Sequence, residues 1–263
     1  MIIGRNFYFI HNPKSAGTSV RKILQKYAIA DHPFAGEYQV YIESLDRTVE
    51  WFHLTAADAR DVLPQPNGTF RFGFVRNPYD RFFSSFNEHC YQHQLKELDI
   101  NQFILQLDRM SLRYDWRYTH LCPQHYFFYV GNRCVADFIG RFERLDQDWS
   151  FIQRTLGMEP HPLGRFKKTD RYENYRKFTL EDLSEASLKK LDELYSRDFD
   201  LFGYQSLTDR VIPPVHASVI ERFAGEPVNV EFDISSLSLG EQCAYWRAVA
   251  NGRIHPESGG SSS

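Results

Sequence analysis

NFYFIHNPKSAGTS, residues 6–19, carries the first clear structural signal of the chain. Residues 6–11 form a short aromatic and β-branched run, which is typical of a buried strand. A helix-compatible stretch at 18–27 follows a loop that contains Pro13 and Gly17. The segment therefore predicts a strand, a loop and a helix, in this order.

A second unit of the same kind begins at residue 69. The run TFRFGFV, residues 69–75, reads as a strand, and residues 79–92 carry apolar side chains at helical spacing, with Pro78 near the first turn. Parallel strands need a helix-length crossover, so these units predict an α/β fold of three layers, a central parallel sheet flanked by helices. Further helices are expected at 56–62, 100–109, 148–156 and about 180–199, the last opened by a Thr179-x-x-Asp182 capping signal.

The chain divides at about residue 204. Residues 1–204 are predicted to form one domain, and residues 205–258 an extension that packs on it, covers it as a lid or joins two copies. Within this extension Pro213-Pro214 marks a break, and residues 228–234 alternate like a strand. Residues 259–263, GGSSS, read as a flexible tail or a cloning remnant.

Composition limits the partners. The 263 residues include 31 Lys and Arg against 34 Asp and Glu, a net charge of −3, which argues against a general nucleic-acid or anionic-membrane surface. Any bound anion must therefore be held by a local site. No apolar run approaches the roughly 18 residues of a membrane helix, no signal-peptide pattern opens the chain, and the four cysteines are widely spaced. We expect a soluble, cytoplasmic protein with reduced thiols.

The loop after the first strand has the chemistry of an anion site. Lys14 offers a full charge, Gly17 a close backbone approach, and Thr18 and Ser19 hydroxyls, all beside a predicted helix N-terminus where N–H groups point outward. The loop is not a Walker A motif, because Lys14 precedes the glycine by three residues. An ordinary helix start with a Thr or Ser cap is the alternative interpretation.

The loop after the second strand offers a second anion site. Arg76 ends the strand, and Ser84 follows about two turns along the helix. If the two strands are neighbours, the Arg76 guanidinium and the Ser84 hydroxyl converge on one phosphate. Two anion sites on one sheet edge suggest a nucleotide with phosphates at both ends.

Three segments together resemble the sulfotransferases that use 3′-phosphoadenosine 5′-phosphosulfate (PAPS), particularly the carbohydrate-type enzymes. HNPKSAGTS, residues 11–19, is similar to their 5′-phosphosulfate loop, RNPYDRFFS, residues 76–84, to their 3′-phosphate element, and FIGRFERL, residues 138–145, to their downstream Arg-Phe-Glu segment. The resemblance implies a P-loop-like sulfotransferase fold, PAPS as donor, its bisphosphate (PAP) as product and no metal. The implied donor-binding residues are Lys14, Ser15, Ala16, Gly17, Thr18, Ser19, Arg76 and Ser84.

A basic segment at 166–171 occupies the place where this family folds a loop over the donor. The resemblance makes Lys168 and Thr169 donor contacts, and a solvated basic loop is the alternative.

Sulfuryl transfer needs a cation for the leaving phosphate and a base for the acceptor. Lys14 suits the first role. His53 lies between the two loops, where the resemblance implies a histidine base, and Glu37 and Glu50 are alternative bases. His11 is expected to be structural.

Two other groups of side chains are given ordinary roles. We expect His89 and His93 to lie on a polar helix face rather than to bind a metal, and the aromatic run 125–129 to be a core strand.

The expected function is transfer of a sulfuryl group from PAPS to a hydroxyl of a carbohydrate. A small-molecule alcohol or amine is the alternative acceptor, and a P-loop kinase or a non-catalytic nucleotide-binding protein is more remote. Loops outside the motifs decide the acceptor, so its identity and the oligomeric state stay open.

Overall fold

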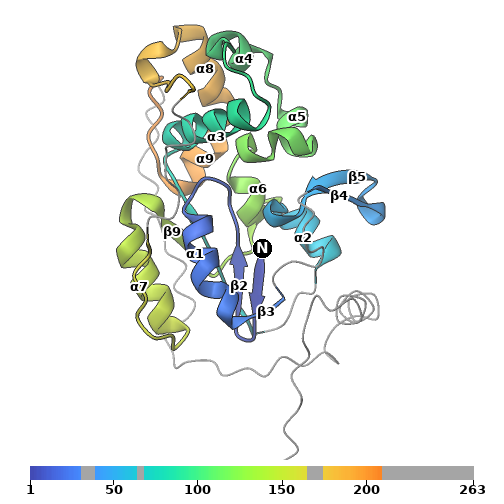
Figure 1. Ribbon diagram of the computed structural model, residues 1–263, viewed down its shortest axis with the longest axis vertical. Coiled ribbons are helices and arrows are strands. Elements are labelled where there is room, and N and C mark those ends of the chain that lie inside the picture. Colours follow the sequence, from blue (N-terminus) through green and yellow to red (C-terminus); the bar gives the residue numbers. More distant parts are fainter. Residues whose placement is uncertain (31–38, 64–67, 165–173, 209–263) are drawn as a thin grey trace, which may run out of the picture.

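A five-stranded sheet forms the centre of the computed structural model, which describes residues 1–30, 39–63, 68–164 and 174–208 (Figure 1). In spatial order its strands are β3 (Ala28–Ala30), β1 (Ile2–Gly4), β2 (Phe7–Ile10), β6 (Phe70–Val75) and β9 (Phe138–Arg141).

The predicted parallel sheet is confirmed for β2, β6 and β9 and wrong for the other edge. β1 is antiparallel to β2, and β3 is antiparallel to β1. Only residues 5 and 6 separate β1 from β2, and a parallel crossover does not fit in so short a connection.

Helices cover both faces of the sheet, as predicted. Phe7 and Phe9 pack in a cluster with side chains of α1 (Gly17–Leu24) and α7 (Leu145–Thr155). Tyr8 and Ile10 alternate to the opposite face. There they join a cluster that includes α2 (Ala56–Val62) and α3 (Pro78–Gln92). The strands are therefore buried on both sides.

A group of helices lies beyond the carboxyl ends of the parallel strands (Figure 1). The group is built around α3 and contains α4 (Ile100–Gln106), α5 (Arg109–Tyr114), the 3₁₀ turn η4 (Trp116–Leu121), α8 (Glu185–Leu194) and α9 (Ser196–Phe202). The hairpin of β4 (Gln39–Ile42) and β5 (Arg47–Glu50) lies to one side, and the short pair β7 (Tyr129–Val130) and β8 (Arg133–Cys134) forms a third sheet. Polar side chains from these elements can therefore meet at the sheet edge.

Two sequence predictions fail for identifiable reasons. The single helix expected at 180–199 is broken into η7 (Leu180–Asp182), α8 and α9. The Thr179–Asp182 capping box is present, but Ser184 then caps α8 separately by accepting from the Ser187 N–H.

The aromatic run expected to be a strand is instead the helical turn α6 (His125–Phe128). The Asp198 carboxylate accepts hydrogen bonds from the backbone N–H groups of Gln124 at 2.7 Å and His125 at 2.9 Å. A carboxylate from a distant helix thus caps this turn, and no local pattern contains that information.

The start of the expected extension is anchored to the helices. The Leu207 N–H donates to the Tyr79 hydroxyl at 2.8 Å, and the Thr208 N–H donates to Asp192 at 3.0 Å. The remainder, residues 209–263, lies outside the described residues, as does the predicted strand at 228–234. Cys90, Cys122 and Cys134 are free thiols.

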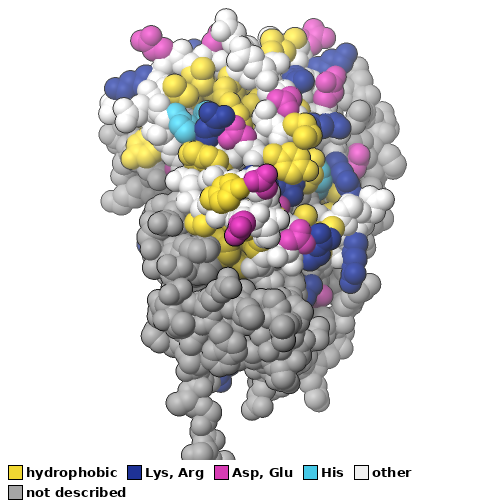
Figure 2. Space-filling view, turned by 90° about the vertical axis from the view of Figure 1, so that its right-hand side faces the viewer, with side chains coloured by type: hydrophobic (Ala, Val, Ile, Leu, Met, Phe, Trp, Pro, Cys, Tyr) yellow, Lys and Arg dark blue, Asp and Glu magenta, His cyan; other side chains and the backbone are white. Residues whose placement is uncertain are grey.

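The surface of the described part mixes both signs of charge. Figure 2 shows acidic and basic side chains interspersed with apolar ones on the side that carries α5 and the β4–β5 hairpin, where Tyr41, Met110 and Tyr114 are exposed. Among the described residues, no helix has the length and apolar character that crossing a membrane requires.

Candidate active site

The loop between β2 and α1 has an unusual backbone that its surroundings hold in place. Lys14 and Ala16 adopt positive φ angles of 61° and 67°, a conformation that costs about 1–2 kcal/mol for a residue with a Cβ. The buried Arg81 Nε donates to the Pro13 carbonyl at 3.0 Å, and the Asn12 side chain donates to the Phe74 carbonyl at 2.9 Å. Strained backbone that is fixed in this way is characteristic of functional loops.

Gln124 joins this loop to the loop that follows β6. Its Oε1 accepts from Asn12 Nδ2 at 3.0 Å and from the Arg76 N–H at 2.9 Å, and its Nε2 donates to the Arg76 carbonyl at 2.8 Å. Gln124 is fully buried. The two motif loops are thus held in one relative position, by a residue that sequence reasoning missed because no motif contains it.

Gly17 is required by a neighbouring ring. A Cβ built at Gly17 would lie 1.9 Å from His11 Cδ2 and 2.0 Å from His11 Nε2. His11 is buried, in agreement with the expected structural role, and its imidazole occupies the space that only glycine leaves open. The expected close approach of a phosphate at this residue stays a prediction.

The hydroxyls of the first loop fall into two classes. Ser15 is buried, and its Oγ accepts from Asn12 Nδ2 at 3.2 Å and donates to the Pro13 carbonyl at 3.4 Å. Its hydroxyl therefore stabilises the loop. Thr18 and Ser19 lie half-buried in the first turn of α1, where a bound anion would meet them.

Lys14 forms an ion pair that the sequence did not predict. Its Nζ lies 2.7 Å from Glu88 Oε2, and the two side chains are 7% and 5% exposed. Glu88 follows Ser84 by four residues on α3, so both lie on one helix face. The four-residue spacing between Ser84 and Glu88 is the sequence signal that could have placed Glu88 beside the second motif.

The second loop places Arg76 and Ser84 on one hollow of about 660 Å³, together with Lys177 and Thr179. The Arg76 guanidinium lies over the Phe142 ring at 4.4 Å, and its Nε is buried with no hydrogen-bond partner among the described residues. Burial lowers the pKa of Arg76, but an arginine remains charged. An orphaned, charged donor in a hollow fits an anion.

The third motif segment meets the second loop. Phe142 belongs to it, and the neighbouring Glu143 accepts from the Asn77 N–H at 2.7 Å through Oε1. The three segments that carry the family resemblance thus lie together, although 138–145 is more than fifty residues beyond the second loop. Lys168, Thr169 and the alternative base Glu37 lie outside the described residues.

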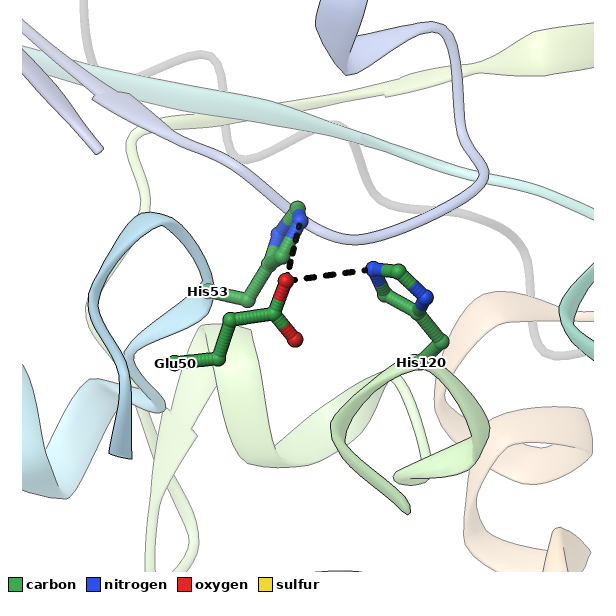
Figure 3. Close-up of side chains that lie close together, drawn as sticks. All are labelled: Glu50, His53 and His120. Carbon is green, nitrogen blue, oxygen red and sulfur yellow. Dashed lines mark ion pairs between the residues drawn. The ribbon is translucent and has the colours of Figure 1, made fainter. Parts of the chain in front are cut away.

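His53 lies beside the first loop in a cluster with Glu50 and His120 (Figure 3). It belongs to η3 (Trp51–His53), directly after β5. His53 Nδ1 is 2.8 Å from the His11 carbonyl oxygen. A carbonyl only accepts, so Nδ1 carries the proton and Nε2 is the free basic atom.

Glu50 Oε1 faces both histidines of this cluster. It lies 3.9 Å from His53 Nε2 and 3.5 Å from His120 Nε2, and the three side chains are 10–13% exposed. Burial lowers the pKa of His53 to about 3 and so keeps the ring neutral. Burial raises the pKa of Glu50, but the two histidines outweigh it and bring that pKa to about 2. The carboxylate is therefore ionised.

These three side chains are also the types that bind transition metals. Zn²⁺ holds nitrogen and oxygen ligands at about 2.0–2.2 Å, so tetrahedral neighbours lie about 3.3–3.6 Å apart. The 3.5 Å between Glu50 and His120 fits this spacing, whereas the 3.9 Å between Glu50 and His53 is wider. The rings of His89, on α3, and His93, directly after this helix, lie 4.5 Å apart. His93 is exposed but His89 is buried, so the expected polar helix face is wrong for His89. That the chain needs no metal stays a prediction.

Comparisons with known proteins identify the family of the chain. A model of the "Sulfotransferase family" matches residues 5–205. Carbohydrate sulfotransferase 10 of Xenopus laevis is 25% identical over an alignment of 246 residues that covers 76% of this chain. The chain spans about 65% of the length of that relative. No solved structure matches the chain. Because the family match extends over most of its length, the chain belongs to the sulfotransferase family.

Proposed function

We propose that the chain transfers a sulfuryl group from PAPS to a hydroxyl of a carbohydrate. The observation that carries the proposal is that one loop serves both halves of the reaction. Lys14 stands in this loop, and the loop's first residue, His11, holds His53 through its carbonyl oxygen at 2.8 Å. The Lys14 cation thus belongs to this loop, and the neutral imidazole of His53 is hydrogen-bonded to the backbone of the same loop.

The donor side fits a ligand with two phosphate groups. Lys14, Thr18 and Ser19 would hold the 5′ end, and Arg76 and Ser84 would hold the 3′-phosphate. The Gln124 bridge fixes the distance between these two groups before any ligand binds, which reduces the ordering that binding requires. When bound, PAPS supplies the sulfuryl group and leaves as PAP.

The base side fits an acceptor hydroxyl. With Nδ1 turned to the His11 carbonyl, His53 presents Nε2 as a proton acceptor. Its low pKa of about 3 keeps it unprotonated at neutral pH, and Lys14 would stabilise charge that develops on the leaving phosphate. The carbohydrate acceptor is inferred from the relative, whose name specifies a carbohydrate sulfotransferase.

Two measurements test the proposal. Thermal unfolding with PAP should show stabilisation, whereas ATP with Mg²⁺ should not, because the loop lacks the Walker arrangement. Transfer of ³⁵S from labelled PAPS is then measured on desulfated glycans and on simple alcohols and amines. His53→Ala should lower kcat by about 10²–10⁴-fold, whereas His93→Ala, at the exposed histidine that follows α3, should not.

The outcomes separate the candidate functions. Stabilisation by ATP and Mg²⁺ but not by PAP would refute a PAPS-dependent enzyme. Binding of PAP without transfer to any acceptor would indicate a nucleotide-binding protein. Transfer only to simple alcohols or amines would support a sulfotransferase but refute a carbohydrate as its acceptor.

A further inference from the structure

We propose that Glu50 and His120 are positioning residues for the base: His120 holds the Glu50 carboxylate in place, and this carboxylate stabilises the protonated ring of His53. The inference rests on the proposed function and extends it from a single base to a cluster of three side chains.

The geometry is that of one carboxylate oxygen between two imidazoles. Glu50 Oε1 is 3.9 Å from His53 Nε2 and 3.5 Å from His120 Nε2 (Figure 3). Glu50 and His53 come from the end of β5 and the turn after it, whereas His120 comes from η4, which packs on α3 and β5. The two rings lie 5.1 Å apart. Distant parts of the chain thus converge on one oxygen atom.

Protonation of His53 creates a need for this carboxylate. The ring is almost completely buried, and a charged group in such a place needs a counter-charge close by. Glu50 is the carboxylate that faces the atom to which the proton is added. Because it stabilises the imidazolium more than the neutral ring, it favours the transition state over the ground state.

His120 has a different task. The carboxylate of Glu50 is itself buried and is repelled by the nearby carboxylate of Glu88. The His120 ring is the closer of the two imidazoles to Glu50, at 3.5 Å, so it is the partner that keeps the carboxylate beside His53. Other titratable groups that act on the cluster are the Met1 amine, Glu88, His11 and His89.

The proton balance is simple. As the acceptor oxygen bonds to sulfur, the bond from sulfur to the 5′-phosphate oxygen breaks, and the hydroxyl proton passes to His53 Nε2. Glu50 stays ionised, and His120 takes no part in the transfer. His53 releases its proton to solvent after the product leaves.

The decisive experiment compares Glu50→Gln in two backgrounds, with ³⁵S transfer to the best glycan acceptor of the panel. In the chain with His53, Glu50→Gln should lower kcat about 10- to 100-fold, a part of the 10²–10⁴ that a base contributes, with little change in KM or in PAP binding. In the His53→Ala chain the same substitution should leave the residual kcat unchanged, because Glu50 acts through His53.

His120 supplies a second comparison that leaves Glu50 in place. His120→Ala should lower kcat about tenfold, and His120→Gln, which keeps an N–H donor, should recover most of it. The double variant Glu50→Gln with His120→Ala should match Glu50→Gln alone. His93→Ala is the matched control, and thermal unfolding of every variant checks that the chain is folded.

Each other outcome overturns the inference. If Glu50→Gln lowers the residual kcat of the His53→Ala chain by the same factor, its role is structural. Full activity of both Glu50→Gln and His120→Ala refutes the cluster but leaves the sulfotransferase proposal standing. A wild-type chain that binds PAP and transfers no sulfate refutes both.

Discussion

The donor side and the base side of the candidate site hold their polar groups in different ways. On the donor side, the fully buried Gln124 is linked to Asn12 and Arg76 by hydrogen bonds of 2.8–3.0 Å. On the base side, Glu50 lies 3.5 and 3.9 Å from its two histidines. These contacts are longer than ordinary hydrogen bonds, which end near 3.2 Å.

The difference matches what each side has to bind. A ligand with fixed, permanent charges is bound best by groups that need no rearrangement. A base must instead admit a hydroxyl and change its own charge. The 3.9 Å gap between His53 Nε2 and Glu50 Oε1 is wide enough for an oxygen about 2.8 Å from both atoms. The donor side is thus held by short hydrogen bonds, whereas the base side keeps wider separations between its polar groups.

The largest effect on the donor side is expected when the Lys14 cation is removed. Lys14→Ala should lower kcat about 10³-fold, the range found when one group that stabilises developing negative charge is lost. It should also destabilise the fold by about 3 kcal/mol, because Glu88 loses a buried ion pair of 2.7 Å. Transfer assays and urea unfolding measure the two effects.

A double variant separates chemistry from stability. Adding Glu88→Gln to Lys14→Ala removes the buried charge and should recover most of the stability but none of the activity. If kcat returns together with stability, Lys14 serves the fold and not the reaction.

The bridge between the motif loops provides the next test. Gln124→Ala should lower the free energy of unfolding by about 3 kcal/mol, because it removes the three hydrogen bonds that this buried side chain makes to Asn12 and Arg76. Urea unfolding measures this, with Gln102→Ala on the exposed face of α4 as the control, expected within about 0.5 kcal/mol of wild type. Equal effects at both glutamines would show that the donor side is not held by Gln124.

Arg76 tests whether the second hollow binds a phosphate. Arg76→Ala should weaken PAP binding roughly 10- to 100-fold, since a hydrogen bond to a charged group contributes about 1.5–3 kcal/mol. Calorimetric titration measures the affinity, and Arg60→Ala, whose side chain is 59% exposed, is the control. A change smaller than about threefold would place the 3′-phosphate elsewhere.

The sequence predicted the regular parts of the fold because their signals are local. The strand at 69–75, the helix at 56–62 and the cap at Thr179 depend on periodicity and capping within a few residues. The edge strands β1 and β3 were missed, since three-residue strands have no period to detect. The antiparallel edge follows from the two-residue connection after β1, which a strict βαβ interpretation overlooks.

The residues of the candidate site also divide into those that the sequence indicates and those that it does not. Lys14, Arg76 and Ser84 stand in contiguous motifs, so the sequence could indicate them. Gln124 and His120 come from segments without a motif and act only through contacts that the completed fold creates. The distance between a residue and its partner along the chain therefore decides which parts of the site a sequence reveals.

The smallest expected effect concerns the base side, and it is the dependence of stability on pH. Burial lowers the pKa of His53 from its ordinary 6.5 to about 3, so between these pH values the unfolded chain binds a proton here that the folded chain does not. Stability therefore falls as the solution becomes more acidic, and by linkage His53 contributes about 1 kcal/mol of that loss between pH 7 and 5.5. His53→Gln should remove this share, so urea unfolding should show the wild type losing more stability than the variant. His93→Gln, at an exposed histidine, should leave the pH dependence unchanged. Parallel curves for wild type and His53→Gln would mean that His53 titrates normally, and the base side would then be as open to water as an ordinary surface.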